Sequence, residues 1–251
     1  MNNAEKRQGQ LMELLSQQTP ISVKELAEQM RVSLSTVRKD LTYLESRHYL
    51  KVSKGIVTIN TNLTIAQGIM TNPKGKRRIA REAASLVSEG NTVFVSAGPC
   101  CIYLAEELLS KNMPLTLVTN SIYLCSTVDT SIPGLELLIT GGRFVRESIS
   151  TTCSQSTQFP NIEIDVAFAE VSGYQTGKGF ASLYEEENCL LSNLSSHSRS
   201  LVVLVDSSCT APVSPDIALS PEDVSIAITD KRPSEFMQAD LREQHIRLVL
   251  V

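Results

Sequence analysis

The chain has 251 residues, of which 42% are apolar and 20% are charged, and its net charge is −4. These values are those of a globular protein with an ordinary core and room for a small accessory domain. The polar start MNNAEKRQGQ lacks the apolar run of a signal peptide, and no apolar run approaches membrane-spanning length, so we expect a cytoplasmic protein without a membrane partner.

The charge is divided unevenly along the chain. Residues 1–60 hold nine Lys and Arg against six Asp and Glu, whereas the remainder holds 14 basic and 21 acidic residues. A basic segment joined to an acidic body is typical of a DNA-binding module attached to a domain with another task. We therefore expect double-stranded DNA as the partner of residues 1–60.

Two helices are predicted at the start of the chain. Apolar residues recur at helical spacing over residues 5–17, and the sequence QQTP then ends the pattern. A second helix begins at Ser22, because the sequence SVKE forms a capping box in which Ser22 and Glu25 bond to each other's backbone. The expected buried positions of the two helices are Leu11, Leu14, Leu15, Val23, Leu26, Ala27 and Met30.

A third helix is predicted over residues 33–47, which read SLSTVRKDLTYLESR. Ser33 is its expected N-cap, and Val37, Leu41 and Leu44 recur at the spacing of a buried face. The other faces carry short hydrogen-bonding side chains and cations, which suit a helix that enters the major groove. The expected DNA contacts of this helix are Ser33, Ser35, Thr36, Arg38, Lys39 and Tyr43.

The second and third helices, joined by the tight turn MRVS, form a predicted helix-turn-helix. The next segment, YLKVSKGIVTI, alternates apolar and polar residues around a glycine and predicts a β-hairpin, the wing of a winged helix. Lys51 and Lys54 are its expected phosphate contacts. The alternative for the third helix is a solvated amphipathic helix with a surface pair of Arg38 and Asp40. Because a carboxylate repels phosphate, we expect Asp40 to have a structural role.

Residues 61–75 are polar, contain Gly and Pro, and are predicted to form an interdomain linker. Apolar strands then alternate with helical patterns over residues 76–251, which predicts a largely parallel, Rossmann-like sheet covered on both faces. The predicted strands are 92–96, 115–118, 135–139, 164–169, 201–205, 225–228 and 246–251. The predicted helices are 76–88, 100–111, 121–129, 184–197 and 234–244.

In parallel sheets, ligands bind beyond the carboxyl ends of the strands. This rule indicates three segments, Ser96–Cys100, Thr119–Ser121 and Thr140–Arg143. The six cysteines include no CxxC pair and are read as free thiols, with thiol sensing or metal binding by Cys100 and Cys101 as the alternative to burial. The three histidines share no ligand spacing, so neither a metal nor a cofactor is expected.

The pattern VSLSTVRKDLTYLE resembles the DNA-binding signature of DeoR-type bacterial transcriptional regulators, VS-x-x-TIRRDL-x-x-LE. In the wing, Ser53-Lys54-Gly55 stands where that family usually has His-Gly-Gly. The resemblance continues through GKRRIAREAASLV, VTNS, IDVAFAEVSG and VDSS, and so covers nearly the whole chain. It implies a winged helix-turn-helix domain over 1–60, the linker, and an effector-sensing and oligomerisation domain over 76–251.

In the DeoR family the sensor domain usually binds a phosphorylated sugar or a related metabolite, which alters the affinity for DNA. The resemblance, with the strand-end rule, implies that the effector-binding residues are Ser96, Gly98, Cys100, Thr119, Asn120, Gly141, Gly142, Gly173 and Glu187. Several family groups are replaced, since Ser96-Ala97-Gly98-Pro99-Cys100 stands in place of Asp-Ala-Gly-Thr-Thr and residues 179–230 contain no Lys. The run of three glutamates at 185–187 is read as a solvated first turn that favours the helix dipole, while the resemblance implies a pocket role for Glu187 alone.

These features predict a sequence-specific transcriptional regulator, a repressor of a carbohydrate or related operon, that responds to a small phosphorylated metabolite. Because one small head buries little surface on DNA, we expect a homodimer or homotetramer. One alternative is an isomerase or transferase, for which Glu187, Glu170 and Asp165 are the candidate bases, although catalysis is not expected. The other is a DNA-binding regulator with a degenerate pocket and no small effector.

Overall fold

A computed structural model describes residues 3–18, 20–46, 50–59, 68–153, 161–183, 185–207 and 216–251. The chain divides into two compact units, the head Met1–Thr71 and the body Asn72–Val251. Parts of the predicted linker, the end of the third predicted helix at Arg47, His48 and Cys209 lie outside the described residues. Within the described part, no helix combines the length and apolar character needed to cross a membrane.

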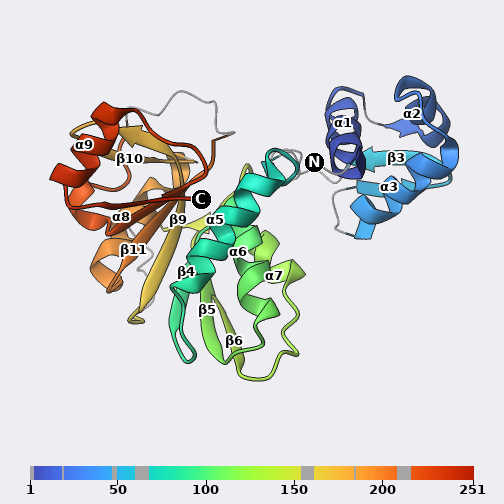
Figure 1. Cartoon of the computed structure of the whole chain (residues 1–251). Helices are drawn as coiled ribbons and strands as arrows, with labels where there is room; N and C mark the ends of the chain where they lie inside the picture. The colour runs from blue at the N-terminus through green and yellow to red at the C-terminus, as the bar shows by residue number, and fades with distance from the viewer. Residues whose placement is uncertain are drawn as a thin grey trace. The chain divides into compact units, whose positions relative to one another are not determined.

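In the described part of the head, the helices α1, α2 and α3 accompany a small antiparallel sheet with strand order β1-β3-β2 (Figure 1). Its elements are α1 Asn3–Gln17, β1 Ile21–Ser22, α2 Val23–Gln29, α3 Leu34–Ser46, β2 Leu50–Ser53 and β3 Ile56–Ile59. The capping box is present, because Ser22 accepts the N–H of Glu25 at 3.1 Å while the Glu25 carboxylate accepts the N–H of Ser22 at 3.0 Å. The predicted winged helix-turn-helix is thus confirmed.

The head has one apolar core. Leu11, Leu15, Leu26, Val37 and Leu44 are fully buried in it, as their helical spacing predicts. The wing joins this core through strand β1, which was not predicted and which pairs with β3. A two-residue strand has too few positions for an alternating pattern, so it could not be predicted from hydrophobic periodicity.

The body is built on a mixed sheet of eight strands with the order β13-β12-β11-β9-β4-β5-β6, in which each of these neighbours is parallel. Strand β10 pairs antiparallel with β9. The seven strands of the parallel path are β4 Thr92–Val95, β5 Leu115–Thr119, β6 Leu135–Ile139, β9 Val166–Gln175, β11 Leu201–Val205, β12 Ile226–Thr229 and β13 Arg247–Leu250. This arrangement confirms the predicted α/β fold class.

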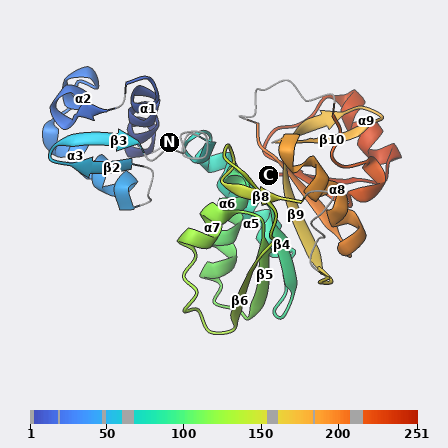
Figure 2. The ribbon, with the colours of Figure 1, turned by 180° about the vertical axis from the view of Figure 1, so that it is seen from behind.

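Helices cover this sheet, and α5 and α6 pack along each other (Figure 1), while the reverse view shows α8 beside β9 (Figure 2). The helices are α5 Pro73–Ser85, α6 Pro99–Ser110, α7 Ile122–Thr127, α8 Asn188–His197 and α9 Glu235–Glu243. Residues 73–75, which were assigned to the linker, form the first turn of α5. The helix starts there because Asn72 caps it by accepting the N–H of Gly75, and Pro73 supplies a helical φ at the first position.

Three short strands of the body were not predicted. The strands β7 Arg143–Val145 and β8 Ser150–Thr152 form a hairpin, and β10 Gly179–Ser182 returns along the far half of β9. Strand β9 is therefore longer than the predicted 164–169. Polar residues such as Ser150, Thr151 and Thr152 are buried in these strands, which hides the apolar pattern that a buried strand usually shows.

Candidate functional site

Helix α3 begins with a set of mutually bonded hydroxyl groups. The Ser33 side chain accepts the N–H of Thr36 at 3.2 Å, as an N-cap does, and its oxygen lies 2.8 Å from the hydroxyls of both Ser35 and Thr36. The expected cap is therefore present. Because these short side chains are held together at the first turn, the backbone there is open to a close approach by a partner.

The two faces of α3 differ as predicted. Val37, Leu41 and Leu44 are buried, whereas Arg38 and Lys39 are exposed. The Tyr43 side chain is 41% exposed on the same helix. This exposed face offers two cations, hydroxyl groups and one aromatic ring along a single helix.

Asp40 fastens α3 to α1. Its carboxylate is nearly fully buried and accepts bonds from Arg7 Nε at 2.5 Å, Arg7 Nη2 at 3.0 Å and Gln8 Nε2 at 3.2 Å. The structural role expected for Asp40 is observed, and its partner is Arg7 rather than Arg38. Arg38 thus stays on the exposed side of the helix.

The wing presents its lysines to solvent. Lys51 lies in β2, and Lys54 lies with Gly55 in the turn, where both residues have positive φ angles of 51° and 78°. Two consecutive residues of this kind form the turn that suits a tight hairpin. The Val52 N–H donates to the Glu45 carboxylate of α3 at 2.7 Å, so the wing and α3 are fixed relative to each other.

In the body, Asn120 of the loop after β5 joins the loop after β4 to strand β8. Its side-chain oxygen accepts the Ala97 N–H at 2.8 Å, and its amide donates to the Thr151 carbonyl at 3.1 Å. Thr119 donates to the Val95 carbonyl at 2.6 Å, and both Thr119 and Asn120 are fully buried. These two predicted effector residues lie together at the carboxyl ends of the strands and fix the shape of that edge.

The N-terminus of α6 holds a carboxylate from the chain itself. Glu170 of β9 accepts the N–H of Cys100 at 2.6 Å and that of Cys101 at 3.3 Å, which are the amides that would otherwise attract an anion. Gly98 has a φ of 146°, and a Cβ there would lie 2.4 Å from Glu170 Oε2, so only glycine leaves room. Ser96 accepts the Glu170 N–H at 3.0 Å. Ser96, Gly98 and Cys100 are thus brought together around Glu170.

Burial raises the pKa of Glu170 to about 7, against the opposing effects of Lys76 and the two amides. The same burial, with the nearby Glu170 charge, raises the pKa values of Cys100 and Cys101. Both thiols are fully buried and protonated at neutral pH. They behave as small apolar groups, the alternative that was expected over metal binding.

Glu187 is a second buried carboxyl at this edge, whereas Glu186 is exposed. The expectation of a solvated first turn is therefore wrong for Glu187. The Ser150 hydroxyl donates to it at 2.5 Å, and Ser150 lies 2.7 Å from Ser148. Burial raises the pKa of Glu187 to about 7, although the serine hydroxyls act in the opposite direction. Near neutral pH this group can hold or release a proton.

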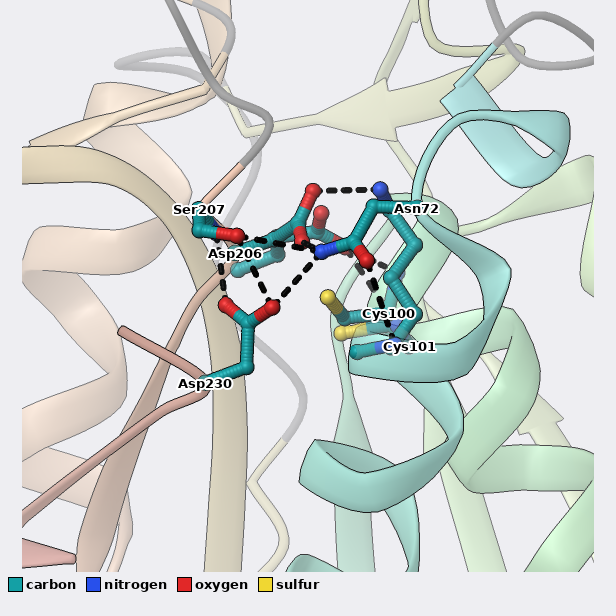
Figure 3. A network of polar contacts seen from close by, with 9 residues as sticks. Asn72, Cys100, Cys101, Asp206, Ser207 and Asp230 are labelled. Atoms are coloured by element: carbon teal, nitrogen blue, oxygen red, sulfur yellow. Dashed lines mark hydrogen bonds and ion pairs between the residues drawn. The ribbon is translucent and has the colours of Figure 1, made fainter. Parts of the chain in front are cut away.

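A polar network joins the start of α5 to the carboxyl ends of β11 and β12 (Figure 3). The Asn72 amide donates to Asp206 at 2.6 Å and to Asp230 at 2.7 Å, and Ser207 donates to Asp230. Lys76 forms a buried ion pair with Asp206. The Asn72 side chain points between the two carboxylates, with Cys100 and Cys101 close below it in this view.

Lys76 is a cation that the sequence reading missed at this edge. It precedes Ile79, Ala80 and Ala83 by three, four and seven positions, so it shares their buried helical face. That spacing was the available signal. The structure therefore places one buried ammonium group at this edge, where the sequence indicated no cation.

The predicted glycines lie in three different settings. Gly141 is exposed with open space where a Cβ would stand, and Gly142 has a φ of 137° with the Thr152 carbonyl only 2.1 Å from such a Cβ. Gly173 lies inside β9, opposite Ala181 of β10, rather than at the end of a parallel strand. Strand pairing, not a ligand-binding turn, occupies that backbone.

Asp165 does not join the other candidate bases. It accepts the N–H of Thr92, the first residue of β4, at 2.9 Å and pairs with Arg199, so it lies at the amino ends of the strands. Of the three candidate bases, Glu170 and Glu187 therefore remain at the carboxyl edge. Among the described residues, no group of three or more His, Cys, Asp and Glu side chains could hold a metal ion.

Comparison with known proteins identifies both units. The family model for the DeoR-like helix-turn-helix domain matches residues 7–62, and the one for the DeoR C terminal sensor domain matches residues 71–231. The HTH-type transcriptional regulator GolR of Listeria innocua serovar 6a is 28% identical over 90% of each chain. The HTH-type transcriptional repressor GlcR of Bacillus subtilis is 24% identical over 92% of this chain and 90% of its own.

Among solved structures, ribose 5-phosphate isomerase A of Methanocaldococcus jannaschii is 17% identical, with a TM-score of 0.39. The likeness covers 55% of this chain and 54% of the isomerase. It is too distant to indicate a shared activity.

Proposed function

The chain belongs to the DeoR family of transcriptional regulators, and from this premise we propose that it represses a carbohydrate-related operon and is released by a small phosphorylated metabolite. The observation that carries the proposal is the exposed face of α3, which presents Arg38, Lys39 and Tyr43. On the buried face of the helix, Asp40 binds Arg7 of α1. Such an exposed face supplies both phosphate contacts and base contacts in a major groove. The names of GolR and GlcR, as regulator and repressor, agree with it.

The DNA-binding part of the proposal is tested by an operator mobility-shift titration of Arg38→Ala. We expect a loss of about 1–3 kcal/mol and a relaxed sequence preference, because Arg38 would contact a base edge. Lys24→Ala is the matched control, since Lys24 is an exposed cation of α2 and its loss changes the charge equally. Unchanged operator affinity in Arg38→Ala would show that α3 does not read the operator.

The effector part of the proposal rests on the carboxyl edge of the body sheet. Asn120, Glu187 and the buried pair of Lys76 with Asp206 supply an amide, a carboxyl and an ammonium group there, which suit the hydroxyls and phosphate of a sugar phosphate. Ribose 5-phosphate and inorganic phosphate are suitable first probes in thermal-shift titrations. Saturable stabilisation by the ester, and not by phosphate alone, is the expected result.

Two other functions have an observation in their favour. The pKa values of Glu170 and Glu187 near 7 are those of general bases, which would suit an isomerase. Turnover of ribose 5-phosphate that disappears in Glu187→Gln would establish an isomerase activity. We propose that the chain does not turn over this substrate. Because Glu170 occupies the N-terminus of α6, the structure would also suit a regulator without an anionic effector. In that case neither ribose 5-phosphate nor inorganic phosphate should change the melting temperature.

A further inference from the structure

Two thiols of the body lie close enough to be joined. Cys153 follows β8, Cys189 lies in the first turn of α8, and their sulfur atoms are 2.9 Å apart. A disulfide has an S–S distance of about 2.0 Å, so closing the bond requires a movement on the order of 1 Å. Both are free cysteines in this structure, and they lie 36 positions apart in the sequence.

The segments that carry these thiols are already held together. Ser150 donates to the Glu187 carboxylate at 2.5 Å, and Thr152 donates to the Glu186 carbonyl at 2.7 Å. The thiol pair is the next contact along the same two segments. The Asn193 amide donates to the Cys189 carbonyl at 2.6 Å and lies 3.6 Å from Cys153 Sγ, so a polar group also faces the sulfur atoms.

The two thiols differ in exposure. Cys189 is exposed, whereas Cys153 is only 7% exposed. Cys100 and Cys101 are fully buried, and Cys125 is partly buried. Among the described thiols, an oxidant in solution therefore reaches Cys189 first, and Cys153 is the thiol placed to react with the product.

We propose that Cys153 and Cys189 form a modification site at which hydrogen peroxide converts the dithiol to a disulfide. The Cys189 sulfur attacks a peroxide oxygen, the O–O bond breaks, and the thiol proton leaves with the departing hydroxide as water. The Cys153 sulfur then displaces the hydroxyl from the Cys189 sulfenic acid, forming the S–S bond and a second water. In sum, two thiols lose two hydrogens and two electrons, and hydrogen peroxide is reduced to two waters.

Burial and the neighbouring Cys189 raise the pKa of the Cys153 thiol to about 11, which agrees with its role as the second thiol to react. The bond would clamp β8 to α8 directly beside the contact of Ser150 with Glu187. If the effector site is the one proposed above, oxidation would stiffen one of its walls and alter ligand affinity. That consequence rests on the proposed function, whereas the disulfide itself does not.

The full chain is treated with hydrogen peroxide, and its peptides are mapped by mass spectrometry without reduction. We expect a cross-linked peptide containing Cys153 and Cys189, with a mass lower by the two hydrogens lost, that dithiothreitol reverses. The rate should not depend on protein concentration, because both thiols belong to one chain. The cross-link should persist in Cys125→Ser and Cys209→Ser and disappear in Cys153→Ser and Cys189→Ser.

Peroxide-treated protein in which Cys189 pairs with Cys209, or with a second chain, or is oxidised without pairing, would overturn the proposal. A circular dichroism spectrum of each serine variant establishes that it is folded. The mapping needs neither DNA nor ligand, so its result is independent of the repressor assignment. If the disulfide is mapped but operator and ligand affinities stay unchanged, the modification site stands and only its proposed effect on the effector site is overturned.

Discussion

The Glu170 carboxylate accepts the backbone N–H of Cys100 at 2.6 Å, so the N-terminus of α6 holds a negative charge that the chain itself supplies. Backbone amides at a helix start are a common binding site for phosphate. A phosphate ester that uses these amides must displace Glu170 or meet it protonated. Since burial raises the pKa of Glu170 to about 7, the protonated form is available at neutral pH.

Glu170→Gln should therefore bind phosphate esters more tightly than the natural chain does. With a pKa near 7, a ligand that needs protonated Glu170 binds the natural chain about tenfold more weakly at pH 8 than at pH 6, and the variant should lose this part of the dependence. Calorimetric titration with ribose 5-phosphate at both pH values measures the effect. Glu186→Gln removes the same charge from an exposed position and should behave as the natural chain. Equal pH dependence in Glu170→Gln would refute competition at α6.

Glu187 gives a prediction for stability. Its pKa is raised from 4.5 to about 7 in the folded chain, so the folded state binds the proton more tightly than the unfolded state. Its contribution is fully present below pH 4.5 and is lost as the pH rises through 7, with a total of about 3 kcal/mol. Urea unfolding at pH 5 and pH 8 should show a smaller difference for Glu187→Gln than for Glu186→Gln. The same difference in both variants would contradict the assignment.

The ion pair of Arg7 with Asp40 should be needed to hold α3. Asp40→Asn keeps the shape of the side chain but removes the charge that Arg7 faces, which should destabilise the head by about 1.5–3 kcal/mol. Operator binding should weaken as well, although Asp40 is buried and would not meet DNA. Thermal unfolding and mobility shifts measure both effects. Asp129→Asn in the exposed part of the body is the control and should change neither.

Local features of the fold were readable from the sequence, and long-range pairings were not. The capping box of Ser22 with Glu25 involves residues three positions apart, so both partners can be recognised within four consecutive residues. Asp206 lies 130 positions from Lys76, and nothing near either residue indicates the other. The same holds for Glu170, which reaches Cys100 across 70 positions.

The candidate site shows the same division. The strand-end rule placed Ser96 and Asn120 at one edge, because it needs only the order of strands and helices. It says nothing of Gly173, which the family resemblance indicated and which pairs with Ala181 in the hairpin of β9 with β10. It also could not find the pair of Cys153 and Cys189, which depends on how β8 returns toward α8.

The wing gives a prediction about salt. Lys54 stands exposed at the turn of the hairpin, where it would contact phosphate rather than a base. Lys54→Ala should weaken binding to all DNA sequences alike and reduce the slope of log affinity against log salt by about one. Mobility shifts at several salt concentrations measure this, with the exposed Lys178→Ala of the body as the control. An unchanged slope in Lys54→Ala would exclude the wing from the interface.

Gly142 and Gly141 form a matched pair for the edge that holds Glu187. A Cβ on Gly142 would lie 2.1 Å from the Thr152 carbonyl oxygen, and its φ of 137° is unfavourable for any other residue. Backbone cannot move aside as a flexible side chain can, so Gly142→Ala should cost about 2–4 kcal/mol of unfolding free energy. Gly141→Ala meets open space and should change it by about 0.5 kcal/mol or less.

Because Thr152 continues from Ser150, which donates to Glu187, the displaced strand should also alter the proposed effector site in Gly142→Ala. Urea unfolding measures the first effect, and thermal-shift titration with ribose 5-phosphate measures the second. The Gly141→Ala variant should keep the unfolding free energy of the natural chain, since no described atom lies within 4 Å of its added methyl group outside its chain neighbours. If both alanine variants unfold at the same urea concentration, the approach of β8 to Gly142 is not what fixes this edge.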